Sequence, residues 1–146
     1  MARIYRKTDR IKVKIGKGED AVILSLSPLS QHEKLEVQSL MFESRLQGKA
    51  KSAVEGVAKA IKFAVKAMEG ALDSDNKPYQ LEFEDGVLKD ECVQDILNME
   101  LAGQIMFVCS ALTSGVPSKF NDNKGEPLPD VEILTGEAEK KSITQT

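Results

Sequence analysis

The sequence is poor in the residue types that most catalytic and metal-binding sites use. Its 146 residues include one histidine, two cysteines and no tryptophan, and aromatic residues make up only 5%. Two cysteines are too few for a disulfide-stapled domain, and a single histidine offers a metal ion no second imidazole. We therefore expect an aliphatic core, no cofactor, no metal site and no enzymatic activity.

Long apolar runs are also missing. No stretch approaches the roughly 20 apolar residues that a membrane-spanning helix needs. The first 16 residues, MARIYRKTDRIKVKIG, are basic and lack the apolar core of a secretory signal. These features predict a reduced, cytoplasmic protein of one domain, with no membrane partner.

The charges are distributed unevenly along the chain. The formal net charge is −3, which argues against a surface built as a whole for nucleic acid. Residues 1–17 nevertheless hold seven Lys or Arg against one acid, whereas residues 71–100 hold nine acids against two Lys. We interpret the two segments as solvated faces of one domain. Attraction between them, within the fold or between subunits, and phosphate binding by residues 3–17 are the alternatives.

The N-terminal part of the sequence predicts a β-hairpin. In residues 10–15, apolar Ile11, Val13 and Ile15 alternate with basic residues, as in a strand with one buried face. Residues 21–26 form a second strand-like run after a glycine-containing turn. Residues 79–83 alternate as well and are a candidate third strand.

The clearest local signal lies just after this hairpin. Ser30 and Glu33 have the spacing of a capping box, and Pro28 stops the preceding strand from continuing. The sequence therefore predicts a helix over 31–47, with Gly48 as the residue that ends it.

Three further helices are expected, over residues 50–69, 91–98 and 101–114. The last is the most apolar segment and ends before Pro117. Together these elements predict an α+β fold in which the β-hairpin packs with about four α-helices. We expect one domain over residues 1–116 and a flexible polar tail over residues 117–146.

The search for catalytic and metal motifs is mostly negative. His32 lies in the first turn of a predicted helix, and Cys109 lies in an apolar helix, where cysteine behaves as a small core residue. A Cys–His pair that includes Cys92 or Cys109 is not excluded by spacing. Residues 73–84 have the length of a calcium loop, but Lys77 and Pro78 replace an oxygen ligand and the required glycine.

A protein-binding surface is the remaining hypothesis. Apolar residues that recur every three or four positions on two helices can form a groove for a partner helix, and methionine makes such a surface adaptable. The alternative is that the same residues form the core of the monomer. The candidate partner-binding residues are Met41, Val54, Val57, Ile61 and Met68.

Residues 21–46 resemble the small tail assembly chaperones of long-tailed bacteriophages. In that family a short β segment ends in a pattern like L-S-x-L-S, and a charged helix with a K/R-x-E core follows. Leu26-Ser27-Pro28-Leu29-Ser30 and then Lys34-Leu35-Glu36 match this pattern here. The order of the later segments and the total length are also similar, so that the resemblance covers roughly residues 10–115.

The resemblance implies a binding protein without a catalytic site. Members bind the tape measure protein, keep it soluble and help to recruit the tail tube protein, in many phages through a frameshift-extended form. The implied location is the host cytoplasm, with the protein absent from the mature virion. Self-association is a further option. The alternatives are a virion structural protein, such as a minor tail or head–tail completion protein, and an enzyme or nucleic-acid-binding regulator.

Overall fold

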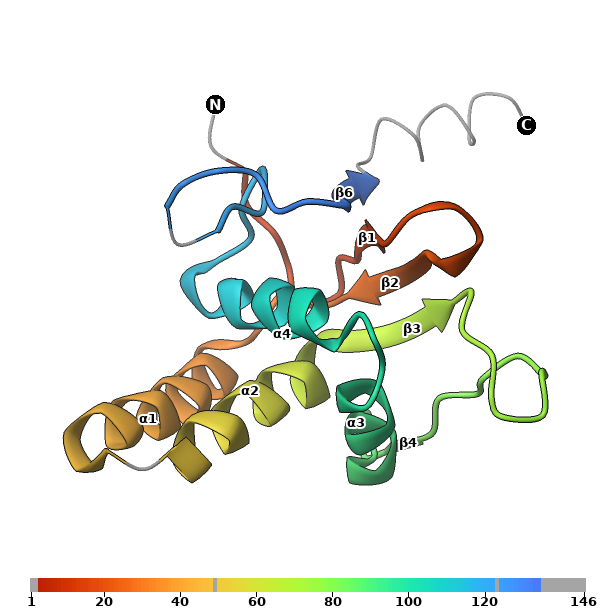
Figure 1. Cartoon of the computed structure of the whole chain (residues 1–146). Helices are drawn as coiled ribbons and strands as arrows, with labels where there is room; N and C mark the ends of the chain where they lie inside the picture. Colours follow the sequence, from red (N-terminus) through yellow and green to blue (C-terminus); the bar gives the residue numbers. More distant parts are fainter. Residues whose placement is uncertain (1–2, 49, 123, 135–146) are drawn as a thin grey trace.

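The computed structural model describes residues 3–48, 50–122 and 124–134. Within these ranges the chain forms four α-helices, two sheets and two short 3₁₀ turns, and Figure 1 shows their arrangement. In chain order the elements are β1 (Ile11–Ile15), η1 (Gly18–Asp20), β2 (Val22–Leu26), α1 (Gln31–Gln47), α2 (Ala50–Ala64), β3 (Val65–Glu69), β4 (Phe83–Glu84), β5 (Val87–Leu88), α3 (Asp90–Leu97), α4 (Ala102–Ala111), η2 (Leu112–Ser114) and β6 (Val131–Leu134).

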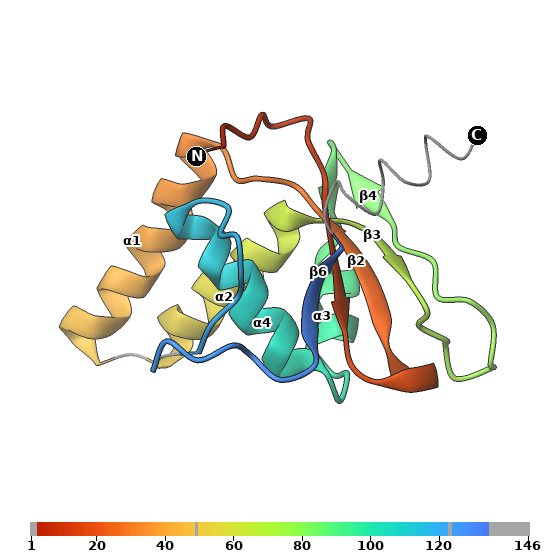
Figure 2. The same ribbon diagram turned by 90° about the horizontal axis from the view of Figure 1, so that it is seen from above.

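The main sheet has four antiparallel strands in the order β3-β2-β1-β6. The predicted hairpin is confirmed as β1 and β2, whose register pairs Val13 with Leu24. Every second residue of both strands is buried, as the alternation in the sequence requires. Helices α1, α2 and α4 lie on one side of this sheet (Figure 2).

One hydrophobic core joins the sheet to the helices. Its buried members extend from Ile11 on β1 to Phe120, beyond the last helix. Helix α4 with η2 corresponds to the apolar helix predicted over 101–114, and it contributes Ile105, Val108 and Leu112. The predicted α+β class and the packing of a β-hairpin with four helices are therefore confirmed. Over the described ranges, no helix combines the length and apolar character needed to cross a bilayer.

The connection between β2 and α1 is a buried structural junction. Ser27 is fully buried, and its N–H donates to the carbonyl of Ala64 at the end of α2, at 2.7 Å. The hydroxyl of Ser27 lies 2.8 Å from the carbonyl of Pro28, while Leu29 packs into the core. Ser30 and Glu33 then form the predicted capping box, and α1 ends at Gly48 in the left-handed conformation. The motif that carries the family resemblance thus connects β2, α1 and α2.

The helix predicted over 50–69 is wrong for its last five residues. Helix α2 ends at Ala64, and the chain continues directly as β3, which pairs with β2. Ala, Lys, Met and Glu favour a helix locally. Pairing with β2 bonds the β3 backbone into the sheet and buries Val65, so tertiary structure overrides the local preference.

The third strand of the hairpin sheet is therefore β3 and not the predicted segment 79–83. The chain from Gly70 to Glu82 is mostly irregular, and Phe83–Glu84 pairs with Val87–Leu88 in a separate two-stranded sheet. The helix predicted over 91–98 is confirmed as α3, which begins one residue earlier, at Asp90.

The polar tail predicted from residue 117 begins too early. Phe120 is only 4% exposed, and β6 pairs with β1 so that Ile133 lies opposite Val13. The four-residue strand Val131–Leu134 is surrounded by polar sequence, which hides its role as a sheet member. The predicted domain boundary after residue 116 therefore excludes residues that belong to the fold. The rest of the predicted tail, 135–146, lies outside the described residues.

Glu33, at the start of α1, should make the stability of the fold depend on pH. Burial alone would raise the pKa of Glu33, but hydrogen bonds from the ammonium of Lys7 and from Ser30 outweigh it and leave the pKa lowered. A lowered carboxyl pKa stabilises the folded state above the unfolded pKa, and this stabilisation is lost as the pH falls through the folded pKa. We expect Glu33→Gln to be less stable than the native chain at about pH 7, with a difference that shrinks towards about pH 3.

Urea denaturation at both pH values measures this difference. Ser30→Ala is the comparison variant, because it removes the other half of the same cap and should cost about 1 kcal/mol at about pH 7. A Glu33→Gln deficit that stays constant as the pH is lowered would contradict a role for the ionised carboxylate.

Candidate functional site

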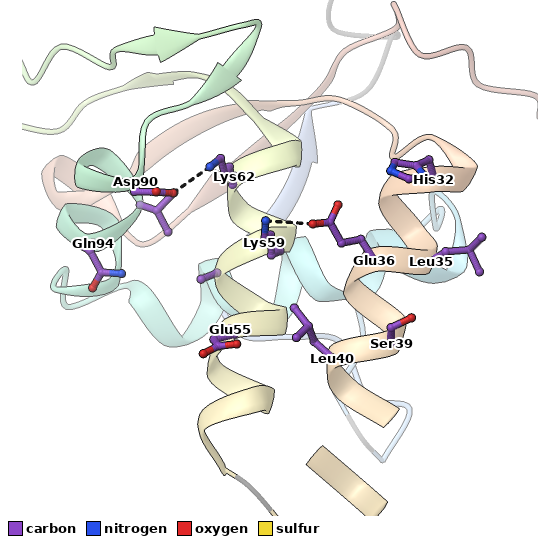
Figure 3. Close-up of a pocket in the computed structure, with 12 residues that line it drawn as sticks. His32, Leu35, Glu36, Ser39, Leu40, Glu55, Lys59, Lys62, Asp90 and Gln94 are labelled. Atoms are coloured by element: carbon purple, nitrogen blue, oxygen red, sulfur yellow. Dashed lines mark hydrogen bonds and ion pairs between the residues drawn. The ribbon is translucent and has the colours of Figure 1, made fainter. Parts of the chain in front are cut away.

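A trough lies on α2 between α1 and α3 (Figure 3). Its volume is about 780 Å³. Helix α2 forms the floor, while α1 and α3 form the two walls. The lining residues are His32, Leu35, Glu36, Ser39 and Leu40 from α1, Glu55, Ala58, Lys59 and Lys62 from α2, and Asp90, Val93 and Gln94 from α3.

The trough exists because α2 packs on its other sides through small residues. Ser52, Gly56, Ala60 and Ala64 recur every four positions and are all buried. A Cβ atom at Gly56 would lie 3.2 Å from the Sδ atom of Met41 on α1, which shows how closely the two helices approach. The longer side chains of α2 at positions 55, 59 and 62 are left to face the trough.

Two ion pairs tie the floor to the walls. The Nζ atom of Lys59 lies 3.0 Å from a carboxylate oxygen of Glu36 on α1, and the Nζ atom of Lys62 lies 2.9 Å from Asp90 on α3. Lys59 also lies 5.8 Å from the centre of the Phe63 ring, within cation–π range. Asp90 is further favoured by its position in the first turn of α3. Both lysines are therefore neutralised by the walls of the trough.

The lining of the trough is mixed: Leu35, Leu40, Ala58 and Val93 are apolar, and the other eight lining residues are polar or charged. Leu40 and Ala58 are partly exposed to it, and Val93 is buried beneath it. His32 is exposed at the rim, next to Leu35. Glu55 has no ion-pair partner among the described residues. A surface of mixed polarity suits an amphipathic helix, whose own diameter is about 10 Å.

The cysteines do not have the environment of a reactive thiol. Cys109 is fully buried, and this burial raises its pKa to about 12, the reverse of the shift that activates a nucleophile. Cys92 is also buried, with its sulfur 3.4 Å from the N–H of Glu82.

Tyr79 has a raised pKa because of burial and a hydrogen bond to Asp95.

The part of the chain that the structure describes contains no cluster of metal-ligating side chains. No group of three or more His, Cys, Asp or Glu side chains there is arranged to hold a metal ion. In the segment that resembles a calcium loop, Asp73 instead accepts the N–H groups of Asp75 and Lys77, at 2.8 and 3.0 Å, and so closes a local turn.

The basic N-terminal segment is attached to the junction before α1. The ammonium of Lys7 donates to the carbonyl of Pro28 and to Glu33, and the guanidinium of Arg10 donates to the carbonyl of Lys7 at 3.0 Å. Lys7 and Arg10 also contribute to a lowered pKa of Lys66, whose main cause is burial. These cations therefore have structural contacts within the subunit.

The five predicted partner-binding residues do not form one surface. Ile61 is fully buried, and Met41 and Val57 pack against the core. Met68 lies on β3 and lines a different pocket, together with Glu19 and Asp20 of η1. Val54 is 60% exposed near the tip of the α1–α2 hairpin, and none of the five lines the trough. The trough could have been suggested only by the polar positions of α2, which recur at 55, 59 and 62.

No protein-family model matches the chain, and comparison with curated proteins and with solved structures found no significant similarity.

Proposed function

We propose that this protein is a phage tail assembly chaperone that binds an amphipathic helix of the tape measure protein in the trough on α2. The proposal has two supports. One is the resemblance of residues 21–46 to this family. The other, which carries the binding mode, is an open trough of about 780 Å³ between α1 and α3, with apolar Leu35, Leu40 and Ala58 in its lining and two lysines that are paired within the subunit.

The chemistry of the trough suits a helix better than a charged ligand. Leu35 and Leu40 of α1 and Ala58 of α2 offer apolar contacts at the trough surface. Because Glu36 and Asp90 already hold the two lysines, a client needs no acidic residue to compensate them. Unpaired Glu55 favours a client helix that carries Lys or Arg next to its apolar face.

The family motif contributes indirectly in this proposal. Its residues Leu26, Ser27 and Leu29 are buried, so they position α1 and do not contact a client. A low affinity at each client segment is sufficient, because a long tape measure protein offers many such segments. Recruitment of the tail tube protein, action in the host cytoplasm and absence from the virion complete the proposed role.

The test is co-expression with the tape measure protein from the same genome, with a tag on one partner. We expect a soluble complex, and an insoluble tape measure protein when it is expressed alone. Ala58→Arg, which places a long cation on the trough floor, should reduce the recovered client about tenfold, equivalent to 1.4 kcal/mol. Val54→Arg lies one turn away on the same helix, outside the trough, and should leave recovery unchanged.

Each other outcome has a distinct meaning. If Val54→Arg abolishes recovery and Ala58→Arg does not, the client binds at the hairpin tip and the trough assignment is wrong. If the tape measure protein is soluble alone and does not associate, the chaperone function is wrong. Recovery of the protein from purified particles would then indicate a virion component. Circular dichroism of both variants checks that α2 is intact.

A further inference from the structure

The N-terminal segment forms a concavity with one end of the main sheet. Its volume is about 580 Å³, and it lies between residues 3–10, the start of β1 and the end of β6. We call it the basic pocket, and it shares no lining residue with the trough. Its lining residues are Arg3, Ile4, Tyr5, Thr8, Asp9, Arg10, Ile11, Lys12, Ile133 and Leu134.

The lining of the basic pocket carries more cations than acids. It includes Arg3, Arg10 and Lys12 but only one acid, Asp9, whose carboxylate accepts the N–H of Arg6 at 2.7 Å. Arg10 donates to two backbone carbonyls, which orient its guanidinium without neutralising the charge. Within the described ranges, neither Arg3 nor Arg10 has an ion-pair partner. The pocket therefore offers two guanidinium groups to an anion, and guanidinium matches the geometry of phosphate.

The positive surface continues from the pocket along β1. Lys12 and Lys14 lie on the face of β1 that is turned away from the core, because every second residue of this strand is buried. Residues two apart on a strand are separated by about 6.6 Å. A polyanion with closely repeated charges, such as a phosphate backbone, can contact both lysines. Glu132 on β6 lies opposite Lys14 and reduces the charge there, so the pocket is the more basic end of this surface.

Tyr5 distinguishes the basic pocket from a site for simple anions. Its side chain is 37% exposed and lines the same pocket as the two arginines. An exposed aromatic ring among cations is the arrangement on which bases stack while their phosphates are held. An acidic peptide would use the cations but leave the ring without a role. A base must be unpaired to reach such a ring, so a single strand fits better than a duplex.

We propose that the basic pocket binds a single-stranded nucleic acid, with phosphates on Arg3 and Arg10 and a base on the ring of Tyr5. Contacts to phosphates and to the face of a base give little sequence preference. The net charge of −3 does not oppose this site, because the acids of residues 71–100 belong to the loop before β4, to β4 and to α3. The site exists whether or not the chain binds a tape measure protein.

Fluorescence anisotropy with a labelled oligothymidylate measures this binding. We expect the affinity to fall with salt, with a slope of log K against log salt of about −0.7 for each phosphate contact. Arg3→Ala should reduce the affinity about fivefold and make the slope shallower by about 0.7. Arg45→Ala is the matched control, because it removes an exposed arginine from α1, outside the pocket, and should change neither quantity.

Two substitutions of Tyr5 separate stacking from a structural role. Tyr5→Ala should weaken oligothymidylate binding about fivefold or more, because the stacked base loses its ring. Tyr5→Phe keeps the ring and should bind as tightly as the native chain. Tyr5 is not a member of the hydrophobic core, so both variants should fold, and circular dichroism checks this. Equal binding by Tyr5→Ala and the native chain would overturn the stacking contact.

The other contrary outcomes are specific. Absence of oligothymidylate binding at low salt would overturn the proposal, as would equal losses in Arg3→Ala and Arg45→Ala. Equal affinity for poly-glutamate of the same charge would assign the pocket to an acidic protein instead. Binding to vesicles of anionic lipid without binding to the oligonucleotide would assign it to a membrane surface. Arg3→Ala should leave recovery of the tape measure protein unchanged, so failure of this proposal is distinct from failure of the chaperone function.

Discussion

Replacing Phe120 with alanine is expected to lower the free energy of unfolding by about 3–5 kcal/mol, as for other buried phenylalanines. Phe120 is 4% exposed and belongs to the core, although it lies in a polar segment beyond the last helix. Its carbonyl also accepts the N–H of Leu128 at 3.0 Å, which turns the chain back towards β6. Loss of the ring would leave a cavity where this segment meets the helices.

Urea denaturation followed by circular dichroism measures this loss. Lys119→Ala is the matched control, because its side chain is exposed and its replacement should change stability by less than about 0.5 kcal/mol. If Phe120→Ala lowers the free energy of unfolding as little as Lys119→Ala does, the segment from 117 to 134 does not stabilise the domain. The predicted domain boundary after residue 116 would then be correct.

The second large effect is a contrast between two aliphatic residues of α2. Ile61→Ala should cost about 2–5 kcal/mol, because Ile61 is fully buried. Val54→Ala should change the free energy of unfolding by less than about 0.5 kcal/mol, because Val54 is 60% exposed. Differential scanning calorimetry of the two variants compares them directly.

The pair separates two orientations of the helix. A continuous apolar stripe that includes both residues, as the sequence suggests, would make the two substitutions similarly costly. The structure places them at different depths, so similar costs would contradict its orientation of α2. A cost at Val54 alone would mean that the hairpin tip is buried in solution.

The parts of the fold that follow from the sequence are those with local signals. The alternation at Ile11, Val13 and Ile15 is sufficient to identify β1, because only one face of that strand is buried. Ser30 and Glu33 identify the start of α1, since a capping box needs only residues within one turn. The apolar run that becomes α4 is similarly evident from its composition.

The strands β3 and β6 have no such signal, because their stability comes from distant partners. Val65–Glu69 is built from helix-favouring residues and becomes a strand only by pairing with β2. Val131–Leu134 is four residues long and becomes a strand only beside β1. In both segments the decisive contacts are made with residues far away in the sequence, which periodicity does not report.

The candidate site was missed because hydrophobicity is a poor guide to the packing of α2. Its large aliphatic Val54 faces outward, while the small residues Ser52, Gly56 and Ala60 are buried. A helix that lies between α1 and α4 must present small side chains to approach both closely. The trough then forms on the remaining polar face, where no apolar pattern points to it.

The position of β1 between β2 and β6 has a consequence for the protein during its synthesis. More than a hundred residues separate β1 from β6, so the hairpin is made long before its last neighbour exists. In that interval the free side of β1 presents unpaired backbone groups to any strand nearby. Lys12 and Lys14 alternate with its buried residues, and charges on an open strand discourage pairing between molecules. These two lysines therefore protect the nascent chain from intermolecular pairing along the side of β1 that β6 covers in the finished sheet.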